Sequence, residues 1–322
     1  MKRFVALGIV VILVAAGWTG AWFWGAGLID GYRRQLAAAD GVAAPKLVCE
    51  NFSIGGYPFG FDLTCTGATL ASGDITVTVK GLKASAQIYN PTHVLLFAEA
   101  PVTIADAFTG SQSRLDFVSA QASARLAGWR IGRVSLVLEN PEWNDTVLGD
   151  RLIARAGHLE AHLLDLPQLH DAAAGLAGLG EYLEIGQLEA PGFDVASGAA
   201  TFEGEADRLP DDIRSWAGSD LLRRWQAAGG SFTLRKLAAS DAAGSLDASG
   251  TLALDAQGKV NGQLKLHSKG VVERLGPLLP EQYRGLVTGA QAADGSYSQT
   301  VSVAAGVVFS GVAPLAVIPP LF

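Results

Sequence analysis

Three polar side chains alternate with apolar ones in the segment His158-Leu159-Glu160-Ala161-His162, and His170 follows shortly after. Successive side chains of a strand point to opposite faces, so His158, Glu160 and His162 share one face. Two imidazoles and a carboxylate can bind zinc, which makes these residues candidate metal ligands of a metal-dependent hydrolase. Their spacing differs from the His-Glu-x-x-His of zinc proteases, which requires a helix. A solvated polar face of an amphipathic strand explains the pattern equally well, and it is the interpretation that we favour.

Other catalytic patterns are missing from the sequence. It contains no Gly-x-Ser-x-Gly nucleophile elbow, phosphate loop or dinucleotide fingerprint. We therefore expect neither an enzyme nor a bound cofactor. Four tryptophans could line a ligand groove, although aromatic residues at such spacing are more often ordinary core: Trp129, Trp143, Trp216 and Trp225.

The composition excludes one class of partner. Among the 322 residues, 24 basic side chains face 31 acidic ones, giving a net charge of −7. Nucleic-acid binding needs clustered basic residues, and no run of Lys or Arg occurs. The 39 glycines favour many short strands joined by tight turns.

The beginning of the chain is typical of a membrane helix. No charged side chain occurs from Phe4 to Ile29, and a helix of about 20 apolar residues spans a bilayer. The aromatic rings near its end suit a headgroup layer. We predict an uncleaved anchor over residues 1–29. The alternatives are a signal peptide cleaved near Ala15-Ala16-Gly17, which the apolar run exceeds by about three turns, and a buried helix of a soluble protein.

The two cysteines decide the predicted location. Basic residues flank the apolar segment on both sides, so the positive-inside rule orients it weakly. Cys49 and Cys65 lie on either side of a turn signal, Gly55-Gly56-Tyr57-Pro58, which would bring them together. An even count at short separation predicts a disulfide in an exported protein, and two buried free thiols are the alternative. We expect a single-pass protein of the bacterial inner membrane with its main domain in the periplasm.

The rest of the chain has the alternation of β-strands. A helical connector is predicted over 30–44, and a period of two begins beyond Pro45, as in Asp74–Lys80. The fold class is mainly β with a few helices: an elongated, curved antiparallel sheet or sheets over 45–322, with possible subregions 45–166 and 183–322. Further strands are predicted over 84–90, 93–104, 114–127, 129–139, 184–190, 199–207, 231–239, 244–255 and 259–267, and a final pair of strands over 286–312.

Three segments interrupt this pattern. Residues 167–182, rich in Ala, Gly and Leu, are interpreted as a loosely specified helix. Residues 211–228 predict an amphipathic helix, with acidic residues at its start and Gly229-Gly230 after its end. A short helix is expected around 271–284.

The segment from Cys49 to Cys65 with its internal Gly56-Tyr57-Pro58-Phe59 resembles the signature of an uncharacterised envelope family of alphaproteobacteria, domain-of-unknown-function family 2125. The stretches Trp225–Gly230, Gly250–Leu266 and Pro319–Phe322 are similar to that family's C-terminal half. The family usually carries a basic residue where this chain has Gly60. The resemblance implies an envelope location and supplies no catalytic residues.

Three functional hypotheses follow. The first is a non-enzymatic, anchored periplasmic protein that binds an apolar, lipid-like ligand on a curved sheet. The second is a scaffolding envelope protein that contacts a protein partner through its sheet edges and residues 318–322. The third, weaker hypothesis is the metal-dependent hydrolase.

Overall fold

The structure, a computed structural model, describes residues 2–216, 220–271 and 291–322. Antiparallel strands dominate these residues, and two α-helices accompany them, which confirms the predicted fold class. The chain forms two compact units. Unit 1 comprises residues 1–123 and 142–152, and unit 2 comprises residues 124–141 and 153–322.

Unit 1 combines the long helix α1 (Lys2–Ala38) with a meander of strands. Its strands pair antiparallel in the order β1-β2-β3-β4-β5-β8. They are β1 (Lys46–Gly55), β2 (Gly60–Ser72), β3 (Ile75–Gln87), β4 (Asn90–Asp106), β5 (Gln112–Asp116) and β8 (Glu142–Asp145). The chain passes from one unit to the other within β6 (Ser119–Ala127), directly before β8, and within β9 (Arg151–Arg155).

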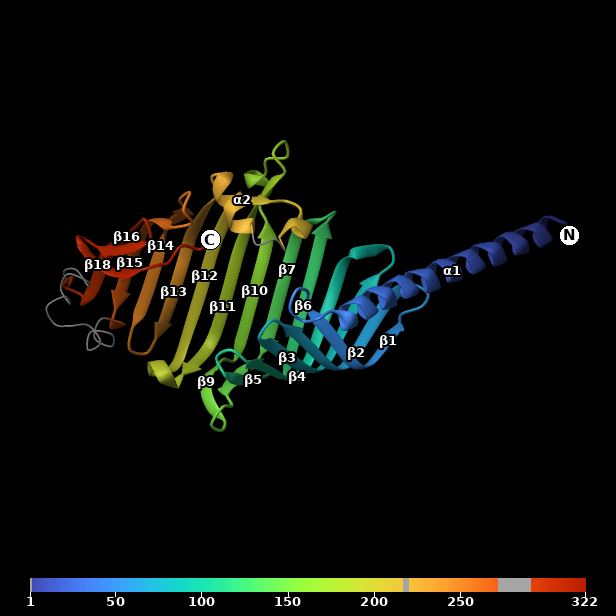
Figure 1. The fold of residues 1–322 in the computed structure, drawn as a ribbon, viewed down its shortest axis with the longest axis horizontal. Helices are drawn as coiled ribbons and strands as arrows, with labels where there is room; N and C mark the ends of the chain where they lie inside the picture. The colour runs from blue at the N-terminus through green and yellow to red at the C-terminus, as the bar shows by residue number, and fades with distance from the viewer. Residues whose placement is uncertain (1, 217–219, 272–290) are drawn as a thin grey trace. The chain divides into compact units, whose positions relative to one another are not determined.

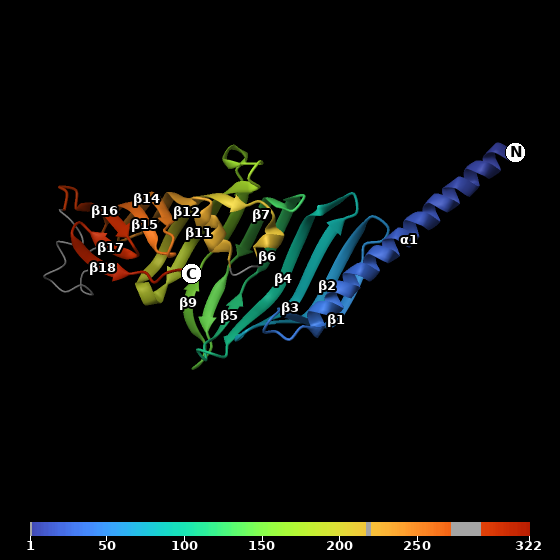
Figure 2. The same cartoon turned by 45° about the horizontal axis from the view of Figure 1, so that its top comes forward.

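Helix α1 joins the predicted anchor and most of the predicted connector in one element. It ends at Ala38, so the expectation of helix up to residue 44 is wrong. The Asp40 carboxylate accepts the backbone N–H groups of Val42, Ala43 and Ala44, which satisfies these donors in a turn instead of a helix. The first half of α1 projects clear of strands β1 and β2 (Figure 1, Figure 2). The helix is long and apolar enough to cross a membrane, and its apolar stretch of 18 residues has a mean hydropathy of 2.3.

The predicted disulfide is present between Cys49 and Cys65, whose Cα atoms lie 5.4 Å apart. The register of the β1–β2 hairpin places Cys49 opposite Ala68 and Cys65 opposite Phe52, so the bond crosses the hairpin diagonally. Cys65, Ala68 and Val79 form a buried cluster around it. The disulfide therefore lies within the apolar packing of unit 1.

Unit 2 is a second antiparallel meander with short helical segments at the strand ends. Its strands pair in the order β7-β10-β11-β12-β13-β14-β15-β16-β17-β18. They are β7 (Arg130–Glu139), β10 (His158–Asp165), β11 (Leu176–Ala190), β12 (Val195–Pro210), β13 (Ser231–Asp241), β14 (Ser245–Leu254), β15 (Val260–Lys269), β16 (Ser296–Ala304), β17 (Val307–Ser310) and β18 (Ala313–Val317). The helical segments are η1 (Pro167–Leu169), η2 (Pro191–Phe193), η3 (Ile213–Ser215) and α2 (Leu221–Ala227).

The stretch 167–182 corrects one prediction. Only the single turn η1 is helical, and Leu176 already begins the long strand β11. A Cβ atom at Gly178 would lie 2.4 Å from the Leu169 side chain. The small residues here thus allow η1 to pack closely on a strand, and they do not indicate a loose helix.

The helix predicted over 211–228 is much shorter. Residues 213–215 form the separate turn η3, and α2 has only seven residues. The Asp212 side chain accepts the backbone N–H of Arg214, which starts η3 as a unit of its own. The helix expected around 271–284 lies outside the described residues, except for Val271.

Candidate functional site

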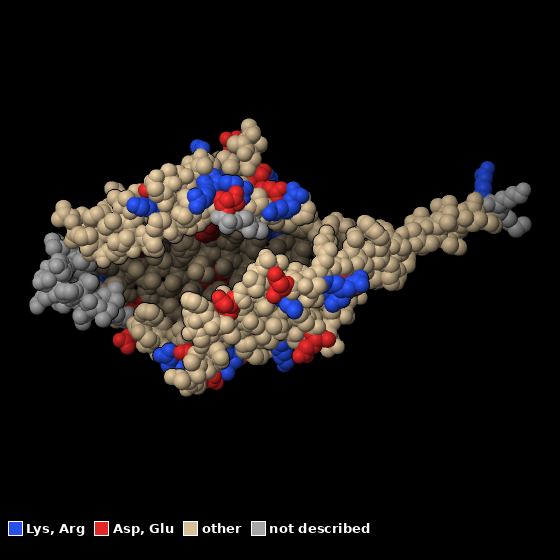
Figure 3. Space-filling view, viewed as in Figure 1, with Lys and Arg blue, Asp and Glu red and all other residues tan. Residues whose placement is uncertain are grey.

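The sheet of unit 2 has two chemically different faces. On β15, Gln263, Lys265 and His267 are exposed, while Leu264 and Leu266 on the other face are half-buried. The pairing register continues this alternation onto β14, β13, β12 and β11. In Figure 3 the surface over β11–β13 is largely uncharged, and charged residues gather near α2. One side of the same strands is therefore polar, and the other is apolar.

The polar face contains the residues singled out by their spacing. The carboxylate of Glu160 lies 3.6 Å from Nε2 of both His158 and His162, as their shared strand face predicts. The ring of His158 also donates Nδ1–H to Glu139 of β7 at 3.1 Å. Desolvation opposes protonation of His158, but the hydrogen bonds to Glu139 and Glu160 outweigh it and raise the pKa of this imidazole.

Strand β11 adds a tyrosine to this group. The ring of His162 stacks on Tyr182 with centroids 5.9 Å apart. Tyr182 donates its hydroxyl hydrogen to Glu184, which, together with desolvation, raises the pKa of Tyr182 to about 12. The phenol is therefore held in its neutral, hydrogen-bonding form at physiological pH.

His158, Glu160, His162 and Tyr182 contact one another in successive pairs along the polar face. In the part of the chain that the structure describes, no group of three or more His, Cys, Asp or Glu side chains has the geometry of a metal site. His170 lies apart from the other histidines and is hydrogen-bonded to Asp165 at 2.6 Å. Further along the polar face, strands β13–β16 line a recess of about 540 Å³ with side chains that include Lys236, Asp247 and Lys265.

The apolar face carries a pocket that sequence reasoning missed. It has a volume of about 580 Å³ and lies beside η2, where β12, β13 and β14 meet. Its lining is mostly small or apolar and includes Leu188, Phe193, Val195, Ala200, Ala239 and Leu246. The alternation of the strands identified the apolar face, but the pocket depends on the turn between β11 and β12, which no pattern specified.

A partly buried carboxyl lies within the apolar face. Glu181 of β11 pairs in register with Leu163 and Gly204, between the apolar neighbours Leu179 and Leu183. Burial raises the pKa of the Glu181 carboxyl. Burial disfavours the ionised carboxylate because water solvates the charge poorly there.

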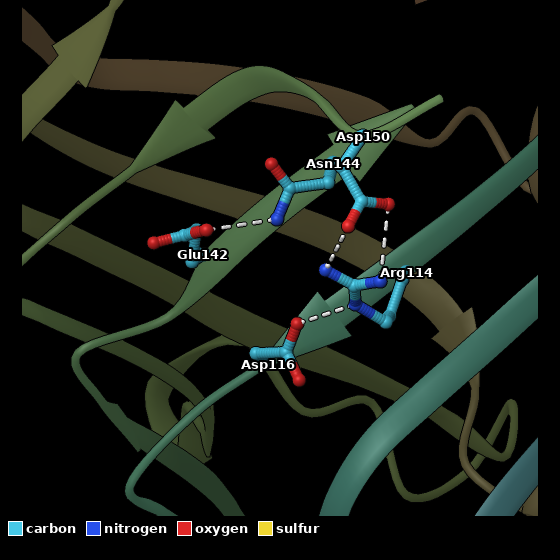
Figure 4. A network of polar contacts seen from close by, with 5 residues as sticks. All are labelled: Arg114, Asp116, Glu142, Asn144 and Asp150. Carbon is cyan, nitrogen blue, oxygen red and sulfur yellow. Dashed lines mark hydrogen bonds and ion pairs between the residues drawn. The ribbon is translucent and has the colours of Figure 1, made fainter. Parts of the chain in front are cut away.

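Unit 1 has its own polar network, drawn in Figure 4. The guanidinium of Arg114 donates Nε–H to Asp116 at 2.7 Å and both terminal nitrogens to Asp150 at 3.0–3.1 Å. These hydrogen bonds raise the pKa of Arg114. Beside it, the buried Asn144 donates to Glu142 at 2.9 Å. The Asp150 carboxylate, bound to Arg114, fixes the loop after β8 to β5, which is a structural role.

The four tryptophans have different environments. Trp225 is buried and donates its indole N–H to the carbonyl of Asp207 at 2.6 Å, as expected of core. The indole of Trp216 donates to the carbonyl of Pro210 at 2.8 Å. Trp129 and Trp143 are exposed, and the guanidinium of Arg214 lies 4.6 Å from the ring centroid of Trp129. None of the four lines either of the two recesses described above.

The C-terminal segment, a predicted protein contact, folds back onto unit 2. The backbone N–H of Leu321 donates to the carbonyl of Gly258 at 2.9 Å. The guanidinium of Arg223 lies 4.8 Å from the ring centroid of Phe322. These contacts occupy part of the segment 318–322 within the chain itself.

Comparison with known proteins places the chain in a family. Residues 22–319 match the family model described as an uncharacterized protein conserved in bacteria, DUF2125. The match covers most of the chain, so this protein belongs to that family, as its cysteine segment indicated. No curated protein and no solved structure matches it.

Proposed function

We propose that this protein is a non-enzymatic component of the bacterial envelope, anchored by α1, whose unit 2 binds an acyl chain or a similar apolar ligand on its apolar face. The observation that carries the proposal is the incomplete burial of that face. Leu183, Phe202 and Leu237 lie on central strands yet are only half-buried. In a two-layer domain such residues would be covered by a second layer.

The pocket beside η2 supports a ligand of this class. Ligand sites are mostly apolar concavities of roughly 300–1,000 Å³, and the pocket of about 580 Å³ lies in that range. An acyl chain would gain free energy by removing these side chains from water, at about 25 cal/mol for each Å² buried. The few polar groups at its edge include Asp194 and Asp241.

The proposed location rests on two features. Helix α1 has the length and apolarity of a membrane span. The Cys49–Cys65 disulfide fits an oxidising compartment, which in bacteria is the periplasm. We propose a single span of the inner membrane, with both units on the periplasmic side.

A photoactivatable fatty acid with a diazirine on its chain would test the ligand site in membranes that contain the full-length protein. We expect labelled peptides from β12–β14 in addition to labelled α1, which reports on bulk lipid. The substitution Leu246→Lys should abolish labelling of the strands, because it places a charge in the pocket.

The matched control is Asp247→Lys. Asp247 follows Leu246 directly and points to the opposite face of β14, where it lines the polar recess. This variant should keep the labelling of the strands. Labelling of α1 alone in the wild-type protein would refute the ligand site, and so would equal labelling of the strands in the two variants.

A further inference from the structure

The tip of the β1–β2 hairpin is fastened to the middle of α1 by side-chain hydrogen bonds. The indole N–H of Trp18 donates to the carbonyl of Pro58 at 2.8 Å, and that of Trp22 donates to the carbonyl of Gly60 at 2.8 Å. The ring of Trp22 stacks on Phe61 with centroids 5.5 Å apart. Because Trp22 is only 6% exposed, this contact is a packed one.

The length of the helix fixes the depth of this contact in a membrane. The uncharged run before Trp18, from Phe4 to Gly17, has 14 residues. At about 1.5 Å per residue it extends about 21 Å, which is shorter than the hydrocarbon core of about 30 Å. A span of about 20 residues that begins at Phe4 ends near Phe23. The last turns of a complete span therefore lie beside the hairpin tip.

The side chains of the tip suit the boundary between headgroups and acyl chains. No charged residue occurs from Asn51 to Phe61. Phe59 is 67% exposed and Tyr57 is 53% exposed, although both are large aromatic residues. The ring centroids of Tyr57 and Phe23 lie 6.4 Å apart, so helix and hairpin present aromatic rings together. Aromatic rings with a polar group are enriched at this depth in membranes.

The backbone carbonyls of the tip accept hydrogen bonds from within the protein, which suits an environment poor in water. The carbonyls of Pro58 and Gly60 accept the two indole N–H groups. The carbonyl of Gly56 accepts the N–H groups of Phe59 and Gly60, and that of Phe59 accepts the N–H of Ile88. A turn in water has no need of four internally satisfied carbonyls, whereas a carbonyl left without a donor in lipid is strongly unfavourable.

We infer that the β1–β2 tip, residues 55–60, is a second membrane contact that inserts its aromatic residues into the boundary of the bilayer crossed by α1. The inference rests on the proposed span. With α1 and the tip both in the lipid, unit 1 is held at two points, which limits its tilt and rotation at the membrane surface.

Spin labels at three positions test the inference in the full-length protein, reconstituted into vesicles of phosphatidylethanolamine and phosphatidylglycerol. The native cysteines are paired, so a nitroxide reacts only with an introduced cysteine. Ile12→Cys reports on the span and Phe59→Cys on the tip. Asp74→Cys is the control, because it lies beyond the other end of β2, about 40 Å along the strand. The backbone N–H of Gly73 there donates to the carbonyl of Gly41, beyond the end of α1.

The ratio of collision rates with oxygen and with a water-soluble nickel chelate reports the depth of each label. We expect ratios typical of lipid at Ile12 and Phe59, and a several-fold lower ratio at Asp74. If the Phe59 label matches the Asp74 label while Ile12 is in lipid, the tip contact is refuted and the anchor stands. If the Ile12 label is in water, the span itself is refuted, and the tip contact falls with it.

Discussion

Units 1 and 2 are both antiparallel meanders with alternating side chains, but their helices cover different parts of them. In unit 1, helix α1 packs on the β1–β2 hairpin, and Trp22 becomes one of the buried residues of the chain. In unit 2, the seven-residue helix α2 contacts the end of β12, and Leu183 and Phe202 remain half-buried. An alternating strand thus specifies an apolar face, whereas a separate element decides whether that face becomes core or a binding surface.

The largest effect that tests this contrast is expected at Trp22. Trp22→Ala removes a buried ring and leaves the carbonyl of Gly60 without its indole donor, so unit 1 should lose about 3–5 kcal/mol of unfolding free energy. Denaturant unfolding of the full chain in detergent micelles measures the change. Trp24→Ala, two residues further along the helix, removes an exposed ring and should change it by less than about 0.5 kcal/mol. Equal losses in the two variants would mean that α1 is not docked on the hairpin.

The disulfide gives the next effect in size. It closes a loop with a sequence separation of 16 residues, and the double variant Cys49→Ser/Cys65→Ser should lower the stability of unit 1 by about 3 kcal/mol. Exchange of backbone amide hydrogens, followed by mass spectrometry, separates the two units. We expect faster exchange in β1–β3 and unchanged exchange in β12–β15. Faster exchange in both units would show that their folding is coupled.

A smaller loss of unfolding free energy is expected where α2 contacts β12 in unit 2. Trp225→Phe keeps the ring but leaves the carbonyl of Asp207 without the indole donor, at a cost of roughly 1–3 kcal/mol. Thermal unfolding measures it. Trp129→Phe, at an exposed position of the same unit, is the control and should unfold at the wild-type temperature. A control variant as unstable as Trp225→Phe would remove the role assigned to the hydrogen bond.

The smallest effect concerns the acid on the open face of unit 2. Burial raises the pKa of Glu181 in the folded protein, so folding favours the protonated carboxyl. The stability contributed by protonated Glu181 is complete below the pKa of this group in the unfolded chain, near 4.3. It is lost as the pH rises through the higher pKa of the folded protein. Glu181→Gln should therefore raise the unfolding temperature at neutral pH, with no gain below about pH 4. A gain that is the same at both pH values would exclude the titration of Glu181 as its cause.

Much of the architecture was predictable because its signals are local. Alternation along Gly250–His267 predicted the β14–β15 hairpin, and the even cysteine count predicted the disulfide. The helix over 211–228 was not predicted correctly, because the structure has the separate turn η3 and the seven-residue helix α2 there. At 167–182, the many small residues suggested a helix. They instead allow the close packing of η1 on β11.

The candidate sites were predictable only in part. Spacing along β10 placed His158, Glu160 and His162 on one face, and the structure brings them together. Their partners Glu139 and Tyr182 come from neighbouring strands, and only the register of pairing selects them. The pocket beside η2 joins residues of four strands and a turn, so no single stretch of sequence carries its pattern.

The sequence by itself determined the apolar helix, the alternating strands, the disulfide and the family, because each depends on residue types or on spacings within one segment. Only the tertiary structure decided where the aromatic residues of α1 lie. Trp18 and Trp22 suggested rings in a headgroup layer, but their N–H donors meet carbonyls 40 and 38 residues away. Such contacts follow from the path of the whole chain, and that path sets which apolar surfaces are covered and which stay open.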